Sequence, residues 1–117
     1  MKLVVDEHES AALLEYLVSS DHRLAASWLL HTEMHCAAGR NPAVLPMQAI
    51  ATVLSAVTLV DLTRGDLLAA GTHTPLRSAD AIHLAAALRM GADVIVTYDV
   101  ELARAASAAG LTVVAPA

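Results

Sequence analysis

Two carboxylates stand where a binding site is expected in a fold of alternating strands and helices. Asp80 lies in the first turn of a predicted helix that is apolar nearly all round from Ile82 to Leu88 and should therefore be largely buried. Asp99 follows directly after the β-branched run Val94–Val96, which is typical of a buried strand in a parallel sheet. Ligands of such sheets bind just beyond the carboxyl ends of the strands. Together, the two acids favour a binding or catalytic site.

Each of these acids also has a purely structural interpretation. A carboxylate in the first turn of any helix gains about 0.3–1 kcal/mol from the helix dipole, which is enough to explain Asp80 alone. Asp99 can simply cap the helix that follows it. For either residue taken singly, both interpretations stay open.

A third candidate acid, Glu33, lies in the middle of a helix predicted over 28–38. At 100° per residue, its face also carries Leu29, Leu30, Cys36 and Ala37. A carboxylate on an apolar face is costly unless it is paired, protonated or bound to a metal ion. The alternative is a surface glutamate on a helix whose apolar face lies elsewhere.

The histidines carry weaker signals. His31 and His35 have the i, i+4 spacing of a zinc-binding pair. However, the helical wheel places both away from Glu33, and no further ligands of the zinc type are evident, so exposed helix histidines are the favoured interpretation. His83 lies one helical turn after Asp80 and can hydrogen-bond to it or orient it, because residues three and four apart share a helix face.

Short apolar segments that alternate with helices predict how these residues are positioned. Strands are predicted at 22–26, 57–60, 94–97 and 111–114, and helices at 9–18, 28–38, 46–56, 63–70, 78–90 and 101–109. Ser27 and Ser78 are expected to cap helices at their N-termini, and Gly39 and Gly91 to end them. The order of elements predicts one α/β domain over 1–117, a three-layer α/β/α sandwich around a parallel sheet.

The composition limits the partners of this domain. Apolar residues make up 56% of the chain and charged residues 16%, and no apolar run approaches the roughly 20 residues of a membrane span, so no membrane partner is expected. The single Cys36 excludes an internal disulfide and agrees with a cytoplasmic location. A net charge of −5 argues against a freestanding nucleic-acid binder, unless a divalent metal ion supplies positive charge at the phosphate.

Two segments carry a resemblance to a known family. Residues 80–85, Asp-Ala-Ile-His-Leu-Ala, followed by 96–99, Val-Thr-Tyr-Asp, resemble the C-terminal half of the PIN domain, in particular the VapC-like toxin ribonucleases of bacterial toxin–antitoxin pairs. The resemblance covers essentially the whole chain. It implies hydrolysis of RNA phosphodiester bonds with Mg²⁺ or Mn²⁺, hard cations that prefer oxygen ligands.

The resemblance also implies roles for single residues and for partners. Glu33, Asp80 and Asp99 are the expected catalytic and metal-binding acids, and Thr97 is expected to hold a water or a phosphate nearby. The expected partners of such a type II toxin are an RNA substrate, a cognate antitoxin protein and a second copy of the chain in a homodimer.

The start of the chain departs from the family pattern. Family members open with a strand that ends in Asp-x-Ser, and its Asp is a primary metal ligand. Here residues 1–7 resemble the end of the helix that follows this strand, so the PIN-like domain is expected to be N-terminally incomplete and to lack the first strand. Asp6 cannot substitute, because it falls at the far end of that helix. Either the truncation is natural or the start of the chain is assigned too late.

The missing strand lies at the centre of the family's sheet. The strands at 22–26 and 94–97 are therefore each expected to lack a partner there, at about 1–3 kcal/mol for each unpaired buried backbone group. On this basis the chain as written is expected to aggregate or to need a partner, and to show no metal-dependent ribonuclease activity. The alternative function is an inactive PIN remnant that retains only antitoxin binding or dimerisation. A phosphate-accepting receiver domain is excluded, because no acidic pair follows a first strand and no lysine ends a strand.

Overall fold

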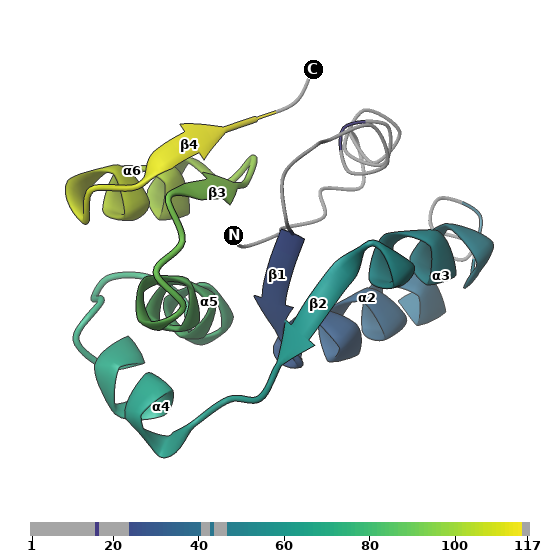
Figure 1. Ribbon diagram of the computed structural model, residues 1–117, viewed down its shortest axis with the longest axis horizontal. Coiled ribbons are helices and arrows are strands. Elements are labelled where there is room, and N and C mark those ends of the chain that lie inside the picture. Colours follow the sequence, from purple (N-terminus) through teal and green to yellow (C-terminus); the bar gives the residue numbers. More distant parts are fainter. Residues whose placement is uncertain (1–15, 17–23, 41–42, 44–46, 116–117) are drawn as a thin grey trace.

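The computed structural model describes residues 16, 24–40, 43 and 47–115 (Figure 1). Its strands and helices alternate along the chain as β1 Leu24–Ser27, α2 Leu29–Arg40, α3 Met47–Ser55, β2 Val57–Val60, α4 Arg64–Ala70, α5 Ser78–Arg89, β3 Val94–Val96, α6 Val100–Ala108 and β4 Thr112–Val114. This alternation confirms the predicted α/β class. The helix predicted at 9–18 lies outside the described residues except for Tyr16, which is helical.

The described strands form two separate parallel pairs. β1 pairs with β2, with Leu24 opposite Val57, and β3 pairs with β4. Within the described residues no ladder joins β1 to β3. Figure 1 shows the two pairs apart, with α2 and α3 beside β1 and β2 and with α6 beside β4. The cores nevertheless connect, because Val96 of β3 belongs to the same buried cluster as Leu24 and Ala26 of β1.

Helix α2 buries a different face from the one the sequence predicts. Its buried residues are Leu30, Met34 and Ala38, which follow the i, i+4, i+8 spacing of one helix stripe. Cys36, assigned to the apolar face with Glu33, is exposed. The predicted face was wrong by about a quarter turn, because α2 packs on β1 and α3 through the neighbouring stripe.

Some helix ends also differ from the prediction. Ser27 ends β1, although its Oγ still accepts a hydrogen bond of 3.3 Å from Leu29 N in the first turn of α2. Gly39 does not end α2, which continues one residue further. Ser78 is the first residue of α5, and Arg77 precedes it in an extended conformation without a side-chain capping bond.

Helix α5 connects the two halves of the described structure, because it packs against α4, β1 and α6. Leu84 and Ala87 are fully buried, which confirms the burial predicted from its apolar sequence. Gly91 follows with φ of +71°, and Ala92 N donates to Ala87 O at 3.0 Å. The predicted left-handed end of this helix is therefore confirmed. The turn leads directly into β3, so one short segment carries both Asp80 and Asp99.

Helix α4 is fixed to α5 by a buried carboxylate that the sequence analysis did not single out. Thr63 and Asp66 form a capping box, in which each side chain accepts a hydrogen bond of 3.0 Å from the backbone N of the other residue. Arg89 Nε donates to Asp66 Oδ1 at 2.6 Å, and Arg89 Nη2 donates to Asp61 O at 3.0 Å. The hydrogen bond from Arg89 holds the pKa of the Asp66 carboxyl below its usual value.

No helix in the described part of the chain combines the length and the apolar character needed to cross a membrane.

Candidate functional site

Asp80 and Asp99 line one pocket of about 280 Å³ at the starts of α5 and α6. Arg77, Val100 and Glu101 complete its lining. Asp80 enters from the first turn of α5, and Asp99 follows β3 at its carboxyl end. The fold thus brings together two of the acids singled out from the sequence, and we call this cavity the acid pocket.

One hydrogen bond holds the side chain of Asp99 and another holds its backbone N. Its Oδ1 accepts a bond of 2.8 Å from Leu102 N, so Asp99 caps α6 as its structural interpretation predicts. Asp99 N donates to the Oγ1 of Thr97 at 3.0 Å. Capping occupies one carboxylate oxygen and fixes the orientation of the other, so the structural role and a ligand-binding role are compatible.

Thr97 has a different role from the expected one. Its side chain is buried, with 1% of the residue exposed, and its hydroxyl accepts the bond from Asp99 N. A hydroxyl buried in this way orients Asp99. The expectation that it contacts a water or a phosphate is not met, because Thr97 faces the interior and Asp99 faces the pocket.

Glu33 reaches α5 from α2. Its Oε1 pairs with Nε2 of His83, whose side chain is 1% exposed, whereas the Glu33 side chain is 40% exposed. The pair joins residues 50 positions apart. His83 follows Asp80 by one helical turn, so the contact brings Glu33 to the helix that carries Asp80. His83 thus contacts Glu33, a partner that the sequence did not predict.

The three acids do not form a three-ligand cluster. Among the described residues, no group of three or more histidine, cysteine, aspartate or glutamate side chains is placed to hold a metal ion. However, Mg²⁺ often binds through one or two carboxylates, with water molecules and substrate phosphates as its other ligands. The all-oxygen donors of Asp80 and Asp99 in the acid pocket fit that pattern.

His31 and His35 lie on the other flank of α2 and stack on each other. Their ring centroids are 4.2 Å apart and their planes meet at 28°. Trp28 continues the row, with its ring centroid 5.5 Å from that of His31. The sequence analysis considered only the zinc-type spacing of the two histidines and missed the row of three rings, although the i, i+3, i+7 spacing was there to indicate it.

Two charged residues of the acid pocket were not predicted as site residues. Arg77 precedes Asp80 by three positions, and the helical wheel already places both on one stripe. Glu101 lies two positions after Asp99 in the first turn of α6. Neither position was specific enough to predict a site residue, because charged residues are common at helix starts.

The chain is similar to known proteins over nearly its whole length. The family model described as the PIN domain matches residues 3–108. Ribonuclease VapC46 of Mycobacterium tuberculosis strain H37Rv is 33% identical over 120 residues, which cover 99% of this chain and 91% of the relative. Ribonuclease VapC35 of M. tuberculosis strain CDC 1551 is 34% identical over 125 residues, with coverage of 99% and 90%. No solved structure gives a significant match.

Proposed function

This chain belongs to the PIN domain family, and from this premise we propose that it is a ribonuclease that hydrolyses RNA phosphodiester bonds with the help of Mg²⁺ or Mn²⁺. The observation that supports the proposal most directly is the acid pocket, in which Asp80 and Asp99 share one cavity of about 280 Å³. Relatives that are named ribonucleases and covered along nine tenths of their length support the same substrate class.

In this proposal the residues of the site have different roles in hydrolysis. Asp80 and Asp99 would hold the divalent ion, which when bound polarises the phosphate and lowers the pKa of the attacking water. Leu102 N holds Oδ1 of Asp99 and the Thr97 hydroxyl holds the Asp99 backbone N, so the position of this pocket residue is largely fixed before a ligand binds. Glu33, which pairs with His83 on the helix that carries Asp80, is the third acid and would orient a water or the RNA backbone.

Removal of the metal is the direct test of this proposal. In contrast to the expectation drawn from the missing first strand, this proposal predicts that the purified 117-residue chain cleaves unstructured RNA in the presence of Mg²⁺ or Mn²⁺, and that excess EDTA abolishes cleavage. Gel analysis of an end-labelled oligonucleotide measures the cleavage rates with the metal ion and with EDTA. Re-addition of Mg²⁺ to the EDTA sample controls for irreversible damage to the protein. Cleavage that survives EDTA would contradict the proposal.

The pair of Glu33 and His83 gives a second prediction. We expect His83→Gln to raise the Mg²⁺ concentration needed for half-maximal cleavage by about 10-fold, because groups that orient a metal-site acid typically contribute 10- to 100-fold. Glu33→Ala should have a similar effect, and the double variant should cost no more than the larger single effect. Fully additive losses would show that the two residues act independently.

Among the described residues that line the acid pocket, Arg77 is the one cation, and we propose that it positions an RNA phosphate there. Arg77→Gln should raise KM by about 10-fold with a smaller effect on kcat, and should reduce the salt dependence of RNA binding by about one unit of slope. Arg104→Gln is the matched control, because Arg104 is exposed on α6 and outside this pocket. Equal changes in the two variants would indicate a general charge effect instead of a contact in the pocket.

The names of the relatives also support a proposal about partners. We infer that the chain acts in a type II toxin–antitoxin system, binds a cognate antitoxin protein, forms a homodimer and works in the cytoplasm. A second candidate function, an inactive domain that keeps only antitoxin binding or dimerisation, is favoured by the lack of a three-ligand cluster among the described residues. The metal experiment separates the two candidates, since the inactive domain cleaves no RNA at any Mg²⁺ concentration.

A further inference from the structure

Three rings form a row on the surface of α2, which we call the aromatic platform: Trp28, His31 and His35. The centroids of His31 and His35 are 4.2 Å apart with planes at 28°, and the Trp28 ring lies 5.5 Å from His31 at 54°. Trp28 is the sole tryptophan of the chain and is 48% exposed. The two histidines are half-buried. A large ring surface therefore faces solvent at the start of this helix.

Backbone contacts fix the platform at both ends. The imidazole Nδ1 of His35 lies 2.8 Å from His31 O, and because a carbonyl only accepts, Nδ1 carries the hydrogen of this bond. Trp28 N donates to Val60 O at 3.1 Å, next to the end of the ladder between β1 and β2. A ligand that stacks on rings held in this way meets a surface that is largely pre-organised, which reduces the entropy lost on binding.

The platform is not needed to pack α2 into the core. The buried stripe of α2 consists of Leu30, Met34 and Ala38, and the helical wheel places the platform on the flank opposite Glu33. Trp28 is one of only three tryptophan, tyrosine or phenylalanine residues in the chain, and His31 and His35 are two of its six histidines. The concentration of rings at one exposed place thus calls for an explanation other than core packing.

We propose that the aromatic platform is a base-stacking site for single-stranded RNA. The inference rests on the proposed function, which supplies RNA as the ligand class. Bases of any sequence stack on tryptophan and histidine rings, and each such contact typically contributes about 5- to 150-fold to affinity. The chain has only 7 lysines and arginines against 12 acidic residues, so counterion release at phosphates offers it little affinity. Stacking provides affinity that does not depend on positive charge.

The single tryptophan makes this proposal directly measurable. The Asp80→Asn chain, which should bind RNA without cutting it, is titrated in EDTA with an eight-nucleotide oligoadenylate while Trp28 emission is recorded. We expect saturable quenching of the emission. An abasic ribose-phosphate oligomer of the same length is the control ligand, and it should leave the emission unchanged because it has no base to stack.

Variants of the platform complete the test. His35→Ala should weaken oligoadenylate binding by about 5- to 150-fold, and Met47→Ala, a change at an exposed apolar residue of α3, should leave it unchanged. Because the fluorescence signal is lost without Trp28, binding to Trp28→Leu and Trp28→Phe is measured by filter retention. The Phe variant should bind several-fold more tightly than the Leu variant, since it keeps an aromatic face.

The following outcomes would overturn the base-stacking proposal, and they are distinguishable from failure of the proposed ribonuclease function. Equal quenching by the abasic oligomer, or unchanged binding by His35→Ala, would show that the rings do not stack on bases. A change of oligomeric state in Trp28→Leu without loss of RNA binding would assign the platform to a protein contact. Metal-dependent cleavage with an unchanged KM in Trp28→Leu would contradict the base-stacking proposal and support the ribonuclease proposal. Quenching without cleavage by the unmodified chain would support base stacking and contradict the ribonuclease proposal.

Discussion

Replacing Asp80 by asparagine should reduce metal-dependent RNA cleavage by the chain more than about 100-fold. Groups that merely support a metal ligand already contribute 10- to 100-fold, and in the proposed site Asp80 would itself hold the ion. Asparagine has nearly the same volume but carries no charge, so the acid pocket keeps its shape and loses half of the paired carboxylates that attract a divalent cation. The initial rate of cleavage at saturating Mg²⁺ measures this effect.

A matched variant shows whether the loss belongs to the site. Asp93→Asn removes the same charge from an exposed residue just before β3, outside the acid pocket, and should cleave RNA at the unmodified rate. Stability of the Asp80→Asn chain should fall by no more than about 1 kcal/mol, the usual contribution of a first-turn carboxylate. Cleavage by Asp80→Asn within a few-fold of that by Asp93→Asn would exclude the role we assign to Asp80.

The largest effect on stability is expected at Asp66. Asp66→Ala removes the capping bond to Thr63 N and leaves the Arg89 guanidinium without its carboxylate, so we expect the free energy of unfolding to fall by about 2 kcal/mol. This is a substantial part of the 5–15 kcal/mol typical of a domain. Urea denaturation measures the change. Asp61→Ala is the control, because Asp61 contributes only its backbone oxygen to Arg89 and should change stability by less than about 0.5 kcal/mol.

The same carboxylate makes the stability of the fold dependent on pH. The pKa of Asp66 in the folded chain is lower than the value of 3.8 for an unperturbed carboxyl, so the unfolded chain takes up its proton first as the pH falls. The stabilisation is complete well above that value and is lost as the pH decreases through the folded pKa. Asp66→Asn should therefore be less stable than the unmodified chain at pH 7, and the difference should shrink towards pH 3. A difference that is constant over this range would show that the pair with Arg89 does not set the carboxyl pKa.

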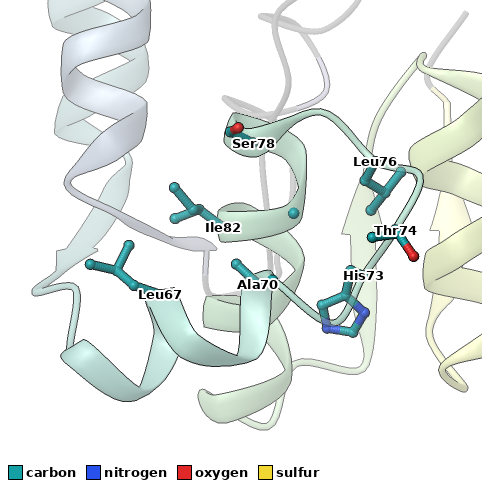
Figure 2. Close-up of a pocket in the computed structure, with 9 residues that line it drawn as sticks. Leu67, Ala70, His73, Thr74, Leu76, Ser78 and Ile82 are labelled. Atoms are coloured by element: carbon teal, nitrogen blue, oxygen red, sulfur yellow. The ribbon is translucent and has the colours of Figure 1, made fainter.

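A pocket lies between α4 and α5 (Figure 2). Leu67 and Ala70 of α4 face Ser78 and Ile82 of α5 across a cavity of about 270 Å³. The pair of Asp66 and Arg89 joins the same two helices. Loss of this pair in Asp66→Ala is therefore expected to act on the α4–α5 contact, away from the acid pocket.

By itself, the sequence determined the order of strands and helices and the features that depend on neighbouring residues. The left-handed Gly91, the buried α5 and the strand Val94–Val96 followed from local chemistry, because a helix end, an apolar helix and a β-branched strand each need only a few adjacent residues. The segments 80–85 and 96–99 were sufficient for the family resemblance, which the family model over residues 3–108 bears out.

The tertiary structure alone decided which side chains meet. Glu33 and His83 are 50 positions apart, and Asp66 and Arg89 are 23 apart, so no periodicity links the members of either pair. Each residue turns a helix by 100°, so an error of about one residue in the buried face of α2 was enough to misplace Glu33. Helix packing sets that face, since α2 buries whichever stripe fits β1 and α3. The sequence could therefore nominate the acids, but only the packing of α2, α5 and α6 determined that Asp80 and Asp99 share a pocket while Glu33 binds His83.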